Sequence, residues 1–318
     1  MAKNYGLNLD SRLSASLERY FKSNVENNVF NTNVTLRHLW MHKETINGGE
    51  SINQAITYLK NQNVAALASR YATIDTTPQD NETTLNDTLG LYPAAITISD
   101  IERDENAGEN VFHLAQQKAS NAMETLRDTI STDIWASSKA AGLSFNTLQA
   151  IVATTGTVHT LASASYWQAI STTSGSFAAQ GLDDMRSTWN QTSNESSEPP
   201  SIIITTRANH EYFEKFGTTK TNVWVPPLTN EGQKLNLGYG GLHFKGTEIL
   251  FDLKAPSGNM YFLNSRFTKL VVSKNHSFKV GKFIRPENAL AETAIISLRG
   301  QIFTSKRGST GVMTSITA

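Results

Sequence analysis

The clearest hydrophobic pattern in the chain lies in residues 110–135. Its apolar side chains recur at three- and four-residue spacing, at Ala115, Ala119, Met123, Leu126, Ile130 and Ile134. This spacing places them on one face of a helix. At 1.5 Å per residue such a helix is roughly 40 Å long, much longer than the average of about 11–12 residues. The pattern therefore predicts a long amphipathic helix that spans a whole domain.

The segments before this helix have weaker patterns. Residues 11–25 carry apolar positions at helical spacing, and residues 34–40 read as strand-like or irregular. Residues 50–98 are polar and extended, with a short helix or strand at 51–60 and a strand at 91–98. Because this stretch buries too little apolar surface to be a domain, it is expected to be disordered, functional or packed against a neighbouring subunit.

The remainder of the chain alternates helix and strand signals. A helix is predicted at 181–194 and another at 207–216, and they flank a continuous apolar run at 201–205 that is typical of a buried central strand. This order indicates a mixed α/β unit. The C-terminal third is rich in strands. They are expected at 248–252, 260–264, 267–272, 278–283, 294–304 and 312–316.

Composition narrows the possible classes of function. The chain has 318 residues, with 28 basic and 28 acidic side chains, so charge alone gives no strong affinity for nucleic acid or anionic membranes. The absence of cysteine excludes disulfides, thiolate catalysis and cysteine–zinc sites. No run of about 18 apolar residues is present, and the N-terminus lacks an apolar signal core. Charged residues make up only 18% of the chain, against about 25% in typical globular proteins.

Histidines provide the main candidates for chemistry. His38 and His42 would share one face of a helix and could bind a metal with Glu44 nearby, but the neighbouring residues do not favour a helix. Surface or interface histidines are therefore the preferred interpretation. His210, next to Glu211, is expected on a solvated helix face.

Two further clusters have ordinary interpretations. Asp183 and Asp184 would point in different directions on a helix, which favours a charge role at its N-terminus. The glycine cluster at 238–241 precedes a strand and lacks the spacing of a nucleotide-binding loop, so it is expected to be a turn. No nucleophile elbow is present. The sequence therefore predicts no catalytic residue, no cofactor site and no metal site.

The order of these elements resembles that of the major capsid proteins of tailed bacteriophages. Their shared architecture, the Johnson fold, is also found in encapsulins. The most similar sequence motifs are the glycine-rich turn and strand at 237–246, Asn-Met-Tyr-Phe-Leu-Asn at 259–264 and Gly-Gln-Ile-Phe-Thr at 300–304. Each motif alone is weak evidence, and the order of elements over nearly the whole chain carries the resemblance.

The resemblance implies an α+β fold with five parts. These are an N-terminal arm at 1–44, an extended β-hairpin loop at 45–98, a peripheral domain with a long spine helix at 99–145, a mixed α/β axial domain at 146–262, and a return to the peripheral domain at 263–318. Only a short arm precedes the loop, which implies that a scaffolding segment is absent or already removed. Some relatives cross-link lysine to asparagine between subunits, but nothing marks Lys60 as reactive.

The resemblance also implies a function. The chain would be a structural major capsid protein that self-assembles into an icosahedral phage head around double-stranded DNA. Its partners would be its own copies in pentamers and hexamers, scaffolding, portal and decoration proteins, and DNA bound on the inner face without sequence specificity. It would be found in the virion, after assembly in the host cytoplasm, and not in a membrane. The alternatives are an encapsulin-like compartment shell and an enzyme acting through His38, His42 or His210.

Overall fold

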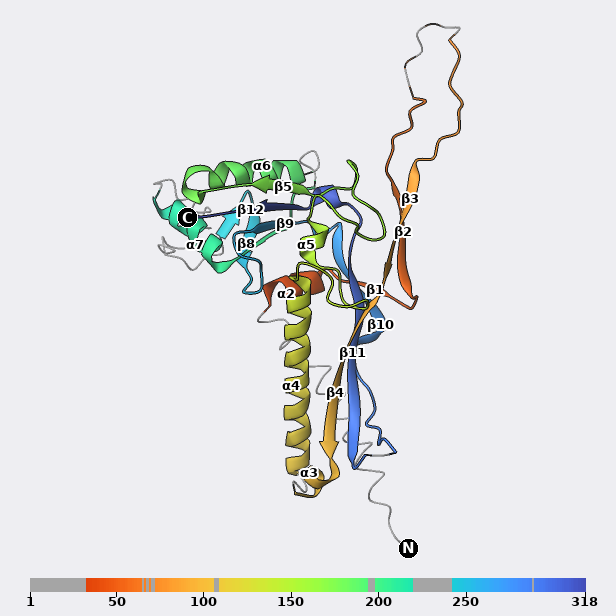
Figure 1. Cartoon of the computed structure of the whole chain (residues 1–318), viewed down its shortest axis with the longest axis vertical. Helices are drawn as coiled ribbons and strands as arrows, with labels where there is room; N and C mark the ends of the chain where they lie inside the picture. The colour runs from red at the N-terminus through yellow and green to blue at the C-terminus, as the bar shows by residue number, and fades with distance from the viewer. Residues whose placement is uncertain are drawn as a thin grey trace, which may run out of the picture.

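The computed structural model describes residues 33–64, 66, 69, 72–105, 109–193, 198–219, 242–287 and 289–318, with the backbone alone at 109–113 and 216–219. Three bodies are visible in Figure 1: an elongated sheet beside a long helix, a second sheet with helices on its faces, and a projecting hairpin. The helix predicted at 11–25 and the glycine cluster at 238–241 lie outside the described residues.

The elongated part is a four-stranded sheet in the order β1-β10-β11-β4. Its strands are β1 (Glu44–Ile46), β4 (Gly90–Ser99), β10 (Thr268–Val280) and β11 (Ala291–Thr304). β11 pairs antiparallel with β10 and β4, and β1 pairs parallel with β10. Helix α4 (Glu109–Ile134) lies along this sheet, and the short α3 (Asp100–Glu105) precedes it at the far end (Figure 1).

Alternation along the strands explains how the helix attaches. On β4 the side chains of Ile96 and Ile98 are buried, whereas those of Ala95 and Thr97, which alternate with them, are exposed. The six apolar residues that predicted the helix are all buried, with exposures of 0 to 5%. The prediction of a long amphipathic helix at 110–135 is therefore confirmed, and the face that it buries is the predicted one.

The second sheet has six strands in the order β5-β12-β9-β6-β8-β7. Its strands are β5 (Ile170–Thr173), β6 (Ile202–Thr205), β7 (Leu242–Phe244), β8 (Thr247–Phe251), β9 (Met260–Leu263) and β12 (Gly311–Thr314). The helical segments around it are α5 (Leu148–Ile151), the π-helix η1 (Phe177–Gly181), α6 (Leu182–Thr192), α7 (Arg207–Thr219) and the 3-10 helix η2 (Arg307–Ser309).

Strand β6 shows why a continuous apolar run belongs in the middle of this sheet. Ile202 and Ile204 join the large core that extends to α4, whereas Ile203 joins a separate core with Phe177 and Met185. Since successive side chains of a strand point to opposite faces, both faces of β6 are covered. The predicted central strand at 201–205, with helices on either side in sequence, is confirmed.

Two segments differ from the sequence prediction or refine it. The prediction of a strand-like or irregular segment at 34–40 is wrong, because residues Val34–Met41 form helix α2. Asn33 caps it by accepting from the Leu36 N–H at 2.9 Å, and Thr35 Oγ1 donates to the buried Asp252 at 2.5 Å. A distant carboxylate thus anchors a helix whose own residues have little helical pattern. The segment at 51–60, for which a helix or strand was expected, is strand β2 (Ser51–Thr57).

Arg307 joins the two sheets at the crossover from β11 to β12. Its side chain is fully buried, and its guanidinium donates to the carbonyls of Ile151 at 3.1 Å, Trp167 at 3.2 Å and Ala150 at 3.3 Å, and also to that of Ala153. Three of these carbonyls belong to α5 or the turn after it. The carbonyl end of a helix carries partial negative charge, which favours a cation there.

Replacing Arg307 by Met is expected to lower the free energy of unfolding by about 3–5 kcal/mol. The apolar chain fills part of the space but removes the guanidinium donor from four carbonyls, of which that of Ala150 keeps the Ala153 N–H at 3.4 Å, and each buried unsatisfied group costs about 1–3 kcal/mol. Denaturant unfolding measures the change. The matched control is Lys306→Met, which removes the neighbouring, partly exposed cation and should change stability by less than about 1 kcal/mol. Equal effects of both variants would contradict this role for Arg307.

Candidate assembly surfaces

A hairpin projects away from the two sheets of the described structure (Figure 1). Strands β2 and β3 (Glu82–Thr88) pair antiparallel from Ser51↔Thr88 to Thr57↔Glu82, and the two legs continue beyond this ladder away from the molecule (Figure 1). Val64 and Ile74, at 78% and 69% exposed, lie in the extended part. Since an isolated two-stranded hairpin is marginally stable in water, this shape favours contact with another molecule.

The base of the hairpin is packed tightly. Leu85 is completely buried in a small core with Trp167, Val271 and Phe303. These residues come from the loop before β5, from β10 and from β11. The hairpin is therefore anchored at its base.

A buried polar cluster also fixes this base. His159 Nε2 accepts from the Thr304 backbone N–H at 3.0 Å, so the imidazole proton is on Nδ1, which donates to Asp87 Oδ2 at 2.7 Å. Asn146 Nδ2 donates to the same Asp87 oxygen and to the Ile302 carbonyl at 3.1 Å. His159 itself has a φ of 53° and stacks on Phe303, with ring centroids 4.4 Å apart. The imidazole is held between a carboxylate and a backbone amide.

The sequence analysis did not find this cluster. Asp87 and His159 are 72 positions apart, and each lies among ordinary polar residues. The backbone here is unusual, because His159 and Thr160 both have positive φ. No sequence pattern reveals this conformation.

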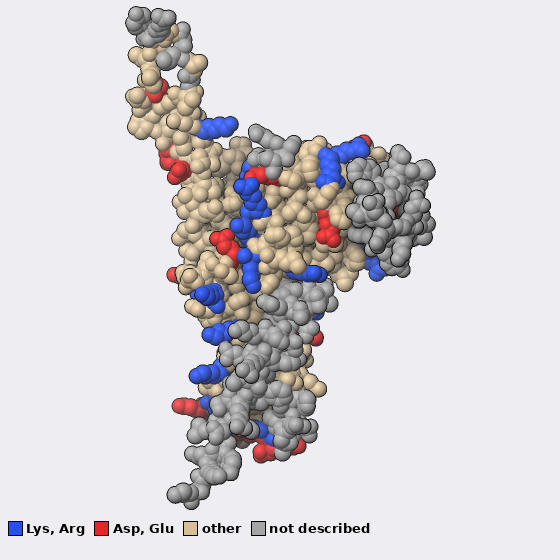
Figure 2. Space-filling model, turned by 180° about the vertical axis from the view of Figure 1, so that it is seen from behind, with Lys and Arg blue, Asp and Glu red and all other residues tan. Residues whose placement is uncertain are grey.

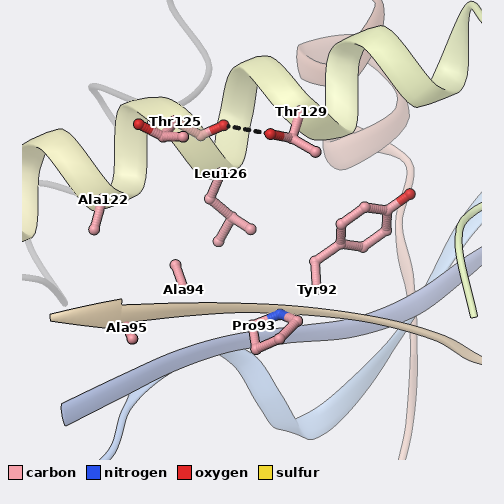
Figure 3. A pocket seen from close by; sticks show the side chains of 8 residues that line it. All are labelled: Tyr92, Pro93, Ala94, Ala95, Ala122, Thr125, Leu126 and Thr129. Carbon is pink, nitrogen blue, oxygen red and sulfur yellow. Dashed lines mark hydrogen bonds between the residues drawn. The ribbon is translucent and has the colours of Figure 1, made fainter. Parts of the chain in front are cut away.

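A groove of about 340 Å³ lies between α4 and β4. Tyr92, Ala94 and Leu126 point into the space between helix and strand, and the Thr129 hydroxyl donates to the Thr125 carbonyl at 2.9 Å along the helix (Figure 3). Burial and the hydrogen bond to Asp133 raise the pKa of Tyr92, so its hydroxyl remains a donor. The lining contains no carboxylate, imidazole or amine, and the groove is not a candidate active site.

The structure separates the proposed histidine pair from Glu44. His38 and His42 lie at the end of α2 with ring centroids 4.7 Å apart, and His42 Nδ1 is 3.0 Å from the His38 carbonyl. The Glu44 carboxylate is instead 3.4 Å from Lys269 Nζ. Within the described ranges, no group of three histidine or acidic side chains could hold a metal ion.

The other candidates have structural partners. His210 contacts Phe251 edge-to-face at 5.3 Å, and burial lowers the pKa of this histidine despite the nearby Glu214 and Glu211. Both aspartates of the 183–184 pair lie in the first turn of α6. Asp183 pairs with Arg186 at 2.8 Å, whereas Asp184 accepts from Ser174 Oγ at 2.6 Å.

Comparison with solved structures identifies the class of fold. The chain has the Johnson fold of phage capsid proteins and encapsulins, as the resemblance predicted. The chain in the capsid of cyanophage A-1(L) superposes with a TM-score of 0.66 at 14% identity, covering 91% of this chain and 94% of that chain.

Two further structures have the same architecture. The capsid of the native GTA particle gives a TM-score of 0.59 at 10% identity, covering 92% of this chain and 91% of that chain. The holo-SrpI encapsulin complex of Synechococcus elongatus PCC 7942 gives 0.52 at 10% identity, with 89% and 86% covered. No protein-family model and no curated protein matches the sequence. The α+β shell-protein fold is thus established by shape, over nearly the full length.

The His38 environment predicts a pH-dependent stability. Burial, and secondarily His42, lowers the pKa of His38 from 6.5 to about 4. Above pH 6.5 the folded and unfolded chains both hold a neutral imidazole, so His38 adds no pH dependence. Between pH 6.5 and about 4 the unfolded chain binds a proton that the folded chain does not. The free energy of unfolding therefore decreases as the pH is lowered from 6.5 to about 4, by at most about 3 kcal/mol.

Unfolding by urea at pH 7 and pH 4.5 tests this dependence. The variant His38→Gln, which cannot titrate, should lose less stability than the wild type between the two pH values. His276→Gln removes an exposed histidine and should leave the difference unchanged. The same loss in wild type and His38→Gln would contradict the assignment.

Proposed function

We propose that this chain is a structural major capsid protein that self-assembles into an icosahedral phage head around double-stranded DNA. The observation that carries the proposal is the full-length agreement with the fold of shell proteins. The projecting hairpin supports it, because its apolar Val64 and Ile74 are exposed in a single chain. The proposal includes no catalytic activity.

The proposed division of the chain is an arm at 1–44, an extended loop at 45–98, a peripheral domain at 99–145, an axial domain at 146–262 and a return at 263–318. α4 would be the spine helix of the peripheral domain. Some strands do not follow this division: β4, at the end of the loop range, lies in the four-stranded sheet, and β12, in the last range, lies in the six-stranded sheet.

The proposed partners are copies of the chain in pentamers and hexamers, together with scaffolding, portal and decoration proteins. DNA would contact the inner face without sequence specificity, in keeping with a net charge of zero. Among the described helices, none is both long and apolar enough to cross a membrane. The protein would reside in the virion after assembly in the host cytoplasm.

An encapsulin-like shell is the second candidate, because the SrpI encapsulin shares the fold. Such a shell would hold protein cargo in place of DNA. The contents of purified particles therefore distinguish the two functions.

Purified protein is expected to form closed, symmetric particles, and particles from the native source should contain nuclease-protected double-stranded DNA. Electron microscopy and light scattering measure the assembly, and nuclease digestion followed by extraction measures the contents. Particles filled with protein and free of DNA would support the encapsulin-like function. A chain that remains monomeric at every concentration and with scaffold present would refute both shell functions.

Shortening the hairpin should block shell closure without unfolding the subunit. The pair Thr57↔Glu82 ends the ladder, so residues 58–81 can be replaced by Asn-Gly, which favours a tight hairpin turn. The buried base at Leu85 and Asp87 remains intact. Circular dichroism should show a wild-type fold with a melting temperature within a few degrees, while sedimentation should show no closed particles. Normal particles from this variant would show that the extended legs do not contribute to assembly.

A further inference from the structure

The turn between β1 and β2 contains a reactive pair of residues, Asn47 followed by Gly48. No other asparagine in the chain is followed by glycine. The residues of this turn, 47–50, are all exposed. In the part of the chain that the structure describes, no atom beyond the neighbouring residues lies within 4 Å of the position that a Cβ on Gly48 would occupy. The turn is therefore in contact with water and not packed against the subunit.

The backbone of this turn has a conformation that suits glycine. Gly48 and Gly49 have φ values of 148° and 106°, which other residues rarely adopt. Arg299 Nη2 donates to the Gly49 carbonyl at 3.0 Å and holds the later part of the turn. Among the described residues, by contrast, no hydrogen bond involves the Asn47 side chain. The carboxamide of Asn47 is therefore unrestrained beside the amide of Gly48.

An asparagine in this position can lose ammonia without a catalyst. Hydroxide removes the proton from the Gly48 backbone nitrogen, which attacks Cγ of Asn47 and closes a succinimide ring. The bond from Cγ to Nδ2 breaks, and the nitrogen leaves as ammonia after it takes a proton from water. A water molecule then opens the ring. The sequence of steps consumes one water, releases one ammonia and changes no oxidation state.

Ring opening gives two products because the ring nitrogen is bonded to two carbonyl carbons. Cleavage of its bond to Cγ gives aspartate in a normal main chain. Cleavage of its bond to the main-chain carbonyl carbon of residue 47 gives isoaspartate, whose main chain runs through Cβ and Cγ. Both products carry a new carboxylate, and isoaspartate also lengthens the connection between β1 and β2.

The rate of ring closure depends on how easily the nitrogen reaches Cγ. A side chain on the following residue hinders the approach, and hydrogen bonds that fix the carboxamide keep Cγ out of position. Small errors in the placement of reacting atoms slow a reaction by large factors. Asn47 meets both requirements, because a glycine follows it and its side chain is unrestrained.

Asn264, which is followed by Ser265, provides an internal comparison in which the fold has the opposite effect. Its side chain is only 4% exposed. Its Nδ2 donates to the carbonyls of Glu198 and Pro199, each at 3.1 Å, and its Oδ1 accepts from the Arg266 N–H at 3.0 Å. The carboxamide is thus fixed at both ends and cannot easily turn toward the next backbone nitrogen.

We propose that Asn47 is a site of spontaneous deamidation, at which the folded chain ages to a mixture of aspartate and isoaspartate. The reaction takes place within one subunit and needs only water and hydroxide. The inference therefore goes beyond the proposed shell function and does not depend on it.

The new charge would arise in basic surroundings. Arg299 contacts the turn itself, and Lys269 lies 3.4 Å from Glu44 in the strand that precedes it. On the face shown in Figure 2, basic side chains lie along the elongated sheet below the hairpin. Opposite charges nearby favour a carboxylate. Each deamidated chain also moves from a formal net charge of zero to one negative charge, so ion exchange separates it from the unmodified chain.

Incubation of the purified full-length protein in mildly alkaline buffer tests the proposal. Digestion at acidic pH followed by mass spectrometry measures the conversion of each asparagine, and an isoaspartyl methyltransferase measures isoaspartate. Asn47 should react within about threefold of the rate in a synthetic peptide of residues 44–50, because the turn does not restrain it. Asn264 in the folded chain should react more slowly than Asn47, by roughly tenfold to a hundredfold.

Two variants and an unfolded sample serve as controls. Asn47→Gln would have to close a larger and less favourable ring, so the acidic form on ion exchange should not accumulate. Asn47→Asp should elute from the start with the aged wild type. Unfolding in guanidinium should raise the rate at Asn264 several-fold or more, and should leave the rate at Asn47 within about threefold.

Each outcome decides the inference without deciding the shell function. If Asn47 keeps its amide in the folded chain while the peptide reacts, or if Asn264 reacts as fast as Asn47, the inference is wrong. It is also wrong if the acidic form accumulates equally in Asn47→Gln. Particle formation is measured separately, and its failure would refute the shell function while leaving the chemistry of Asn47 in place.

Discussion

The two sheets of this protein depend on one buried cation at their junction. Arg307 follows β11 of the elongated sheet and precedes β12 of the other, and its guanidinium reaches four backbone carbonyls. A buried charge without a carboxylate partner is costly to desolvate, and burial lowers the pKa of this arginine. The planar fork of arginine is suited to several carbonyls at once. The relative placement of the two sheets is thus set by directional bonds as well as by the apolar core.

The same loop region that Arg307 holds also supports the hairpin. Trp167 supplies one of the four carbonyls, and its side chain belongs to the same small core as the hairpin residue Leu85. His159, in the same region, bonds Asp87 on one side and Thr304 on the other. A displacement of this loop would therefore disturb the hairpin base and the sheet junction together. The direction of the hairpin is therefore a property of the folded subunit.

The sequence predicted those parts of the fold that depend on local periodicity. The helix at 110–135 and the strand at 201–205 each bury a regular apolar pattern, so the sequence predicted the positions of both correctly. Helix α2 was missed because Asn33 caps it and the remote Asp252 anchors it. The sequence predicted neither the role of Arg307 nor the Asp87–His159–Asn146 cluster. Apart from the local Asn33 cap, these interactions join residues that are well separated in the chain, and no sequence pattern connects their side chains.

Weak contacts suit the role proposed for the hairpin. An exposed ion pair contributes only about 0–1 kcal/mol, so a single hairpin held by a few such pairs would bind loosely. In a closed symmetric assembly every copy gives one hairpin and receives another, and contacts made after the first are effectively intramolecular. A misplaced subunit held by one such contact can leave, whereas a correctly placed one is held by several. The rigid base would therefore set the direction of the hairpin, and a weak contact along its length would keep assembly reversible.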